Sequence, residues 1–138
     1  MTSTDPRLVH IGEVVDRTGL SHRTIRYYEE MGLLTPAGRT EGGFRLYDEA
    51  GIERLLLVKP MKPLGFTIEQ IGELLRALDT VADPDADEAR RATAAAVVER
   101  THTSAQERVV ELKAATARAE AFTERLTYEM ETGPARPR

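Results

Sequence analysis

Basic and hydroxyl-bearing side chains gather at the start of one predicted helix near the N-terminus. Ser21 is placed to cap this helix, because its hydroxyl can accept a hydrogen bond from a backbone amide of the first turn. The first two turns then carry His22, Arg23, Arg26 and Tyr27. These turns are where a recognition helix meets DNA. The chemistry that these residues predict is therefore the recognition of DNA.

The residues around this stretch predict a helix-turn-helix that would present it. Apolar residues recur at helical spacing on both sides of the helix breaker Gly19, so two short helices can share one core. The apolar positions are Ile11, Val14, Val15, Leu20, Ile25 and Tyr28. The first helix is predicted over residues 12–18 and the second from about His22 to Met31, where Gly32 ends it. The first helix has only about two turns, so its stability must come from packing on the second.

Residues 35–47 predict a β-hairpin wing directly after the second helix. They hold Gly and Pro residues, then alternate apolar and polar side chains around a Glu-Gly-Gly turn. Arg39 and Arg45 lie on the two arms, where they could straddle a phosphate backbone. A plain surface loop is the alternative interpretation, and the position of the segment favours the wing.

Two further helices follow the predicted wing. Asp48 is expected to cap a helix that runs to Val58 and that kinks or ends between residues 59 and 64, because Pro60 and Pro63 remove amide donors. Thr67 and Gln70 have the spacing of a capping box, which predicts another helix to about Leu78. These elements complete a small DNA-binding domain over residues 11–80.

A long uninterrupted helix is predicted over residues 83–131, with Asp83 as its cap and Pro84 at its first position. Apolar residues recur every seven positions along a seam formed by Val98, Ala105, Leu112, Ala119 and Leu126. Such a seam predicts a coiled coil, and its broad, Ala-rich form fits antiparallel pairing with a second copy. A solvated single helix and a helical hairpin are the alternatives, and the unbroken run disfavours them.

The expected architecture is thus mainly α: a winged helix-turn-helix DNA-binding domain with a small β-hairpin wing, followed by a long C-terminal coiled-coil dimerisation helix. Residues 1–10 are expected to be a flexible N-terminus, and residues 132–138 a disordered tail.

Composition limits the class of protein. The chain has 138 residues and no Cys, which suits one small domain with an extension and excludes disulfides, thiolate zinc sites and thiol-based sensing. The net charge is −4, with nine basic and nine acidic residues up to residue 66 and ten against fourteen after it. DNA binding must therefore depend on the local placement of Arg and Lys. There is no apolar run long enough for a membrane span, so a soluble, cytoplasmic protein is expected.

Catalysis and metal binding are not indicated. No Ser-His-Asp order, paired acids in a pocket-forming context or phosphate loop is found, so we expect neither an enzyme nor a cofactor. The acidic residues between Asp79 and Glu88 are interpreted as charges that complement a helix N-terminus, and no metal is assigned to them. His102 falls on the coiled-coil seam and is interpreted as a buried, hydrogen-bonded side chain.

The order of these parts resembles the mercury-resistance-regulator (MerR) family of bacterial transcription regulators over nearly the whole chain. The motifs that carry the resemblance are IGEVVDRTGLSHRTIRYYEEMGLL, GRTEGGFRLYDEAGIERL, LGFTIEQIGELL and the Ala-rich segment after them. It implies a homodimer through residues 83–131 that binds a near-palindromic operator of double-stranded DNA and acts with RNA polymerase at a promoter. Members of the family bend and untwist the promoter so that its two elements align.

The resemblance also assigns roles to individual residues. His22 and Arg23 are expected to contact base edges, because Arg can donate two hydrogen bonds to guanine. The residues expected to contact phosphate are Arg26, Tyr27, Arg39, Arg45 and Lys62. Tyr28, and by the same reasoning Phe44 and Tyr47, are interpreted as core residues.

A second function class stays open beside the DNA-binding regulator. A coiled-coil adaptor could use the winged module to dock a protein partner, since the charge of that module is neutral. Within the first class, the residues do not distinguish an effector-gated activator from a repressor or architectural protein without a ligand.

Overall fold

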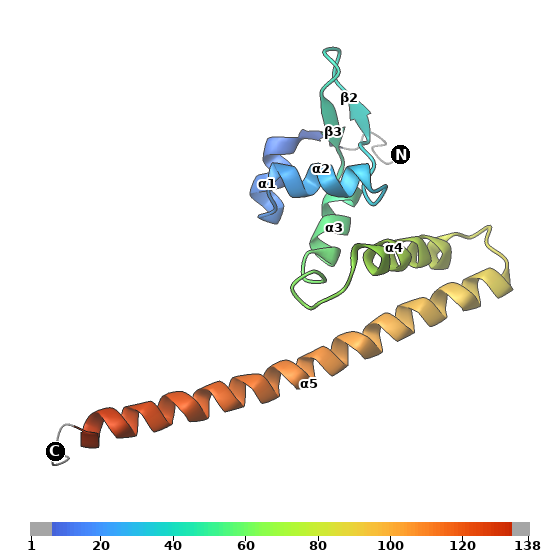
Figure 1. Cartoon of the computed structure of the whole chain (residues 1–138). Helices are drawn as coiled ribbons and strands as arrows, with labels where there is room; N and C mark the ends of the chain where they lie inside the picture. Colours follow the sequence, from blue (N-terminus) through green and yellow to red (C-terminus); the bar gives the residue numbers. More distant parts are fainter. Residues whose placement is uncertain (1–6, 134–138) are drawn as a thin grey trace. The chain divides into compact units, whose positions relative to one another are not determined.

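The computed structural model describes residues 7–133, which fold mainly as helices with one small sheet (Figure 1). In chain order the elements are β1 (Val9–His10), α1 (Ile11–Thr18), α2 (His22–Glu30), β2 (Gly38–Arg39), β3 (Arg45–Tyr47), α3 (Glu49–Val58), α4 (Ile68–Ala82) and α5 (Glu88–Thr132). They belong to two compact units, one up to Val98 and one from Glu99 onward. The predicted fold class, a winged helix-turn-helix followed by a long helix, is confirmed.

The sheet joins the wing to the start of the chain. Its three strands run antiparallel in the order β1-β3-β2, with Val9 opposite Tyr47 and Arg39 opposite Arg45. The hairpin closes through Thr40 and Gly43, where the Gly43 amide donates to the Thr40 carbonyl over 2.9 Å and Gly43 has a φ of 88°. Val9 and His10 form β1, so the flexible N-terminus predicted for residues 1–10 does not include them. Residues 1–6 lie outside the described part of the chain.

The core of the first unit forms where α1, α2, α3 and β3 meet. Val14, Ile25, Tyr47, Ile52 and Leu55 are each at most 2% exposed. Val14 and Ile25 lie on the apolar faces that the helical spacing predicted, Ile52 and Leu55 come from one face of α3, and Tyr47 points inward from the sheet. Burial of such side chains from four elements is what stabilises helices that are too short to persist alone.

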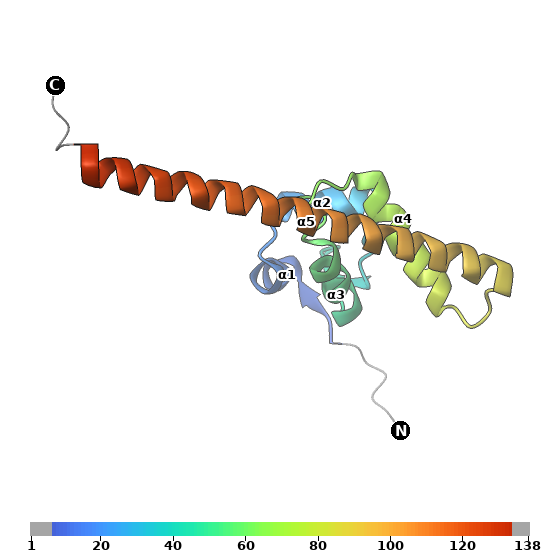
Figure 2. The ribbon, with the colours of Figure 1, turned by 90° about the horizontal axis from the view of Figure 1, so that it is seen from below.

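A polar contact ties α1 to α3, which lie side by side in Figures 1 and 2. The Lys59 ammonium at the end of α3 donates to the Thr18 carbonyl at the end of α1 over 2.6 Å. The ammonium lies close to Gly19, which ends α1 with a φ of 75°: a Cβ at Gly19 would be 2.9 Å from the Lys59 Nζ. The left-handed backbone conformation favours glycine there, and a Cβ would displace only the flexible end of the Lys59 side chain.

Three predicted helix caps are confirmed. The side-chain oxygens of Ser21 and Asp48 accept hydrogen bonds from the Thr24 amide (3.1 Å) and the Gly51 amide (2.9 Å). Thr67 and Gln70 form a complete capping box. The third helix ends at Val58, before the prolines at positions 60 and 63, as predicted.

The predicted start of the long helix is wrong. The fourth helix continues four residues past Leu78 to Ala82, and Asp83 ends it in an extended conformation (φ −80°, ψ 114°). Asp83 opens a turn rather than the next helix, since its Oδ1 accepts a hydrogen bond from the Asp85 amide over 2.9 Å and its carbonyl accepts one from the Ala86 amide over 3.2 Å. Asp87 caps α5 instead, because its Oδ1 accepts a hydrogen bond from the Arg90 amide over 2.7 Å.

The second unit, described up to residue 133, is the rest of α5. No side chain between residues 99 and 133 is buried in the isolated chain. The exposed large apolar side chains on the seam and beside it include Val109, Leu112, Leu126 and Met130. His102 is exposed in the isolated chain, where the seam has no partner helix, so its burial on the seam stays a prediction. The tail was predicted to begin at residue 132, but Thr132 is helical. Residues 134–138 lie outside the described part of the chain.

None of the helices in residues 7–133 combines the length and apolarity needed to cross a bilayer.

Candidate nucleic-acid interface

The second helix, α2, turns its basic residues outward. Ile25 and Tyr28 are buried, while His22, Arg23, Arg26 and Tyr27 are all exposed. The first turn carries no acidic residue, so the positive end of the helix dipole is not neutralised locally. Neither Arg23 nor Arg26 makes an ion pair with another residue between positions 7 and 133. The helix N-terminus is therefore a cationic surface that is open to a partner.

The wing places two further arginines directly opposite each other. Arg39 in β2 and Arg45 in β3 are cross-strand partners in the antiparallel pair. Like charges in such a pair repel each other, and the repulsion is reduced here because Arg45 also pairs with Glu29 of α2. The Arg39 guanidinium donates to the Gly43 carbonyl over 2.9 Å, which holds its side chain along the turn. A phosphate group near the wing would offset the repulsion between the two arginines.

An acidic residue of α2 connects the helix to the wing. One oxygen of the Glu29 carboxylate accepts from the Arg45 Nε (2.5 Å) and the other from the Tyr47 hydroxyl (2.8 Å). The Glu29 side chain is 15% exposed, and Tyr47 is 1% exposed. The hydrogen bond to Glu29 raises the pKa of Arg45, and burial, followed by the same carboxylate, raises the pKa of Tyr47 to about 12. Both Glu29 oxygens are thus occupied by donors from the wing strand.

Between α2 and the wing lies a groove of about 250 Å³, which we call the wing groove. It is lined by His10, Ile11, Arg26, Gly43, Phe44, Arg45 and Tyr47. Phe44 is 69% exposed, so its interpretation as a core residue is wrong, whereas Tyr28 and Tyr47 are buried as expected. Phe44 lies beside the hairpin turn, just before β3, and its ring is mostly exposed there. His10, Phe44 and Glu29 were not predicted as site residues.

Lys62 does not join this group. It is exposed on the turn between α3 and α4, while the wing precedes the N-terminus of α3. In Figure 1 that turn lies at the end of α3 away from the wing. Its predicted contact with phosphate would have to be made separately from those of Arg26, Arg39 and Arg45.

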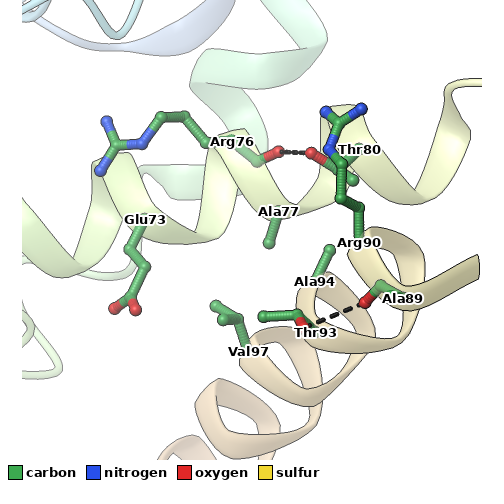
Figure 3. A pocket seen from close by; sticks show the side chains of 9 residues that line it. All are labelled: Glu73, Arg76, Ala77, Thr80, Ala89, Arg90, Thr93, Ala94 and Val97. Atoms are coloured by element: carbon green, nitrogen blue, oxygen red, sulfur yellow. Dashed lines mark hydrogen bonds between the residues drawn. The ribbon is translucent and has the colours of Figure 1, made fainter. Parts of the chain in front are cut away.

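A second hollow lies between α4 and the first turns of α5, within the first unit (Figure 3). It measures about 420 Å³, and Ala77 and Ala94, each 6% exposed, form its floor. The other lining residues are Glu73, Arg76, Thr80, Ala89, Arg90, Thr93 and Val97. The hydroxyls of Thr80 and Thr93 donate to carbonyls of their own helices, those of Arg76 and Ala89. Its open, alanine-lined form is that of a seam between two helices rather than of a catalytic site.

Within the described residues, no three His, Cys, Asp or Glu side chains come close enough together to hold a metal ion. Three of the acidic residues between Asp79 and Glu88 instead form hydrogen bonds with backbone amides or an ion pair with a side chain of the protein. Asp83 and Asp87 accept hydrogen bonds from the Asp85 and Arg90 amides, and Asp79 pairs with Arg54 of α3. The cap of α5 at Asp87 agrees with the interpretation of these acids as helix-terminus charges.

Comparison with known proteins gives consistent matches. A family model described as "MerR HTH family regulatory protein" matches residues 9–78. The mercuric resistance operon regulatory protein of Bacillus cereus is 45% identical over 69 residues, which are 50% of this chain and 52% of that protein. The transcriptional regulator CueR of Salmonella typhimurium is 36% identical over 83 residues, 60% of each chain. The chain thus spans about half to three fifths of the curated relatives that it matches, and these relatives are transcription regulators, not enzymes.

Solved structures share the fold over a greater length. A chain described as HiNmlR, a MerR family regulator lacking the sensor domain and bound to promoter DNA, has a TM-score of 0.72 at 22% identity, covering 92% of this chain and 96% of that one. A putative MerR family transcriptional regulator from Listeria monocytogenes has a TM-score of 0.68 at 24% identity, covering 92% and 90%. At these identities the likeness establishes the fold.

Proposed function

The chain belongs to the MerR family of helix-turn-helix regulatory proteins, and we infer from this and from its surface that it is a sequence-specific DNA-binding transcription regulator acting as a homodimer. The observation that carries the inference is the cationic surface formed by the start of α2 and the wing. Arg23 and Arg26 are exposed there without ion pairs among the described residues, and Arg39 and Arg45 face each other on the wing. DNA phosphates are the partners that such an arrangement suits.

We assign two kinds of contact to this surface. His22 and Arg23, at the capped start of α2, contact base edges in the major groove. The phosphate contacts, which set the register without reading the sequence, come from Arg26, Tyr27, Arg39, Arg45 and Lys62. The assignment explains how a chain of net charge −4 can bind DNA, because few groups are needed if they are well placed.

The homodimer is proposed to form through α5. Val109, Leu112, Leu126 and Met130 of this helix are 44–73% exposed in the isolated chain, which is unusual for a repeated set of large apolar side chains. Pairing of two such helices would bury the stripe and hold two recognition helices at fixed spacing on a near-palindromic operator. The dimer would then act with RNA polymerase by bending and untwisting the promoter.

The proposal is tested by footprinting on the promoter region beside the protein's own gene, together with binding measured against salt concentration. A protected near-palindrome, with an affinity that falls steeply as salt rises, is expected. The variant Arg23→Ala should lose the preference for this site over a scrambled duplex and keep its affinity for the scrambled duplex. Unchanged preference in this variant would refute the role given to Arg23.

The adaptor function predicts a different result in the same experiment. A protein that dimerises but has no affinity for any duplex at low salt would be a coiled-coil adaptor rather than a DNA-binding regulator. The adaptor function stays a candidate because the first 66 residues carry nine basic and nine acidic residues and are therefore neutral overall.

A further inference from the structure

We propose that the hollow between α4 and the first turns of α5 binds a small organic anion with an apolar body, of the class of the aromatic carboxylates. Arg76 and Arg90 hold the carboxylate of this ligand, and Ala77 and Ala94 contact its apolar part. The proposal goes beyond the proposed function, because neither the recognition helix nor the wing takes part in it.

The size and the inner surface of the hollow suit such a molecule. Its volume of about 420 Å³ lies within the range of about 300–1,000 Å³ that is usual for small-molecule sites. In Figure 3 the side chains of Ala77 and Ala94 point toward each other from the two helices, with Val97 further along α5. The hydroxyls of Thr80 and Thr93 already donate to backbone carbonyls. The inner surface therefore offers a ligand mainly apolar contact.

Two cations on the rim of the hollow favour an anion. Arg76 comes from α4 and Arg90 from α5, and both side chains are exposed. Neither guanidinium group forms an ion pair or a hydrogen bond with another side chain in the described range 7–133. In Figure 3 both guanidinium groups point to one side of the hollow, whereas the Glu73 carboxylate points to the other. A ligand carboxylate on the first side would meet two donors that form charge-assisted hydrogen bonds.

Gly72 gives the Arg76 side chain its place on α4. A Cβ at Gly72 would lie 3.1 Å from the Arg76 Nη1, so the guanidinium lies against the helix where residue 72 has no side chain. The side chain of Arg76 is thus partly ordered before a ligand binds. Such ordering lowers the entropy cost of binding.

The experiment titrates the intact, isotope-labelled protein with phenylpropionate and follows the backbone amide signals by NMR. Signals of residues 73–80 and 89–97, on the two helices that line the hollow, should shift until they saturate. Signals of residues 105–130, on the remainder of α5, should stay in place. The neutral phenylpropionamide is the matched ligand control, and it should bind at least about fourfold more weakly because it cannot pair with the two arginines.

Three variants test the residues of the site. Arg76→Gln and Arg90→Gln should each weaken the binding of phenylpropionate roughly two- to fivefold, as for the loss of one exposed ion pair, and leave the affinity for the amide unchanged. Ala89→Leu narrows the hollow from an exposed lining position, so it should weaken the binding of both ligands. Arg118→Gln, which makes the same charge change on the exposed surface of α5, is the matched control. Thermal unfolding of each variant identifies losses that come from the fold.

Several results would overturn the proposal. Shifts confined to residues 105–130 would mean that the probe binds the exposed seam of α5 instead. Equal affinity for the carboxylate and the amide, or unchanged affinity in both arginine variants, would remove the role of charge. Absence of any shift would mean that the hollow takes no such ligand and that a second copy of the chain covers it in solution. No DNA is present in this experiment, so its failure leaves the proposed function intact, and the failure of footprinting leaves this site intact.

Discussion

Replacing Tyr47 by Phe should destabilise the fold and change its response to alkaline pH. The Tyr47 hydroxyl is buried and donates to Glu29 over 2.8 Å, so the substitution removes one hydrogen bond to a charged group and keeps the ring. Hydrogen bonds of this kind contribute roughly 1.5–3 kcal/mol. At neutral pH we therefore expect Tyr47→Phe to lose about 2 kcal/mol of unfolding free energy.

The pH dependence gives the prediction its second, independent part. The pKa of Tyr47 is raised from 10 to about 12 by burial and by the hydrogen bond to Glu29, so the folded state keeps the phenol proton longer than the unfolded state does. Stability from this group is complete below pH 10 and is lost as the pH rises toward 12. Two pKa units correspond to about 2.7 kcal/mol, so the wild-type protein and Tyr47→Phe should become similar in stability near pH 12.

The assay is urea unfolding followed by circular dichroism at a fixed protein concentration, at neutral pH and at steps between pH 9 and pH 11.5. Tyr128→Phe is the control, because Tyr128 is 57% exposed and its substitution should change stability by less than about 0.5 kcal/mol. Equal stability of Tyr47→Phe and the wild-type protein at neutral pH, with the same alkaline response, would refute the reasoning.

Three further predictions concern other elements. Arg17 donates two hydrogen bonds to Glu49, and this contact lowers the pKa of the Glu49 carboxyl. The ion pair therefore stabilises the fold above the ordinary Glu pKa, and this stabilisation is lost as the pH falls through the lowered pKa. The variant Glu49→Gln should show a smaller fall of melting temperature between pH 6 and pH 3 than the wild-type protein. Leu112→Asp, which puts a charge at the middle of the seam, should convert the dimer to monomer in analytical ultracentrifugation, and an unchanged sedimentation coefficient would count against pairing through α5. Lys62→Ala should weaken binding to all duplexes equally and lower the salt slope by about one, whereas a loss confined to the operator would contradict a phosphate contact.

Local features of the fold could be predicted because their causes lie within a few residues. The caps at Ser21, Asp48 and Thr67 each join a side chain to an amide three residues away. The start of α5 was predicted wrongly at Asp83, although Asp83 and Asp87 are equally good caps. In the structure the Asp83 carboxylate accepts from the Asp85 amide within a turn, and the Asp87 carboxylate accepts from the Arg90 amide at the start of α5.

The sequence by itself determined the order of the elements, the helix-turn-helix and the basic character of α2, because periodicity and capping depend on neighbours along the chain. Only the tertiary structure decided that Glu29, sixteen residues before Arg45, holds the wing against α2, that Tyr47 is buried and that Phe44 is exposed. These outcomes depend on how the sheet packs on α1 and α2. Alternation along the wing predicts that Phe44 and Tyr47 face opposite ways, but only the packing shows which of the two faces is buried.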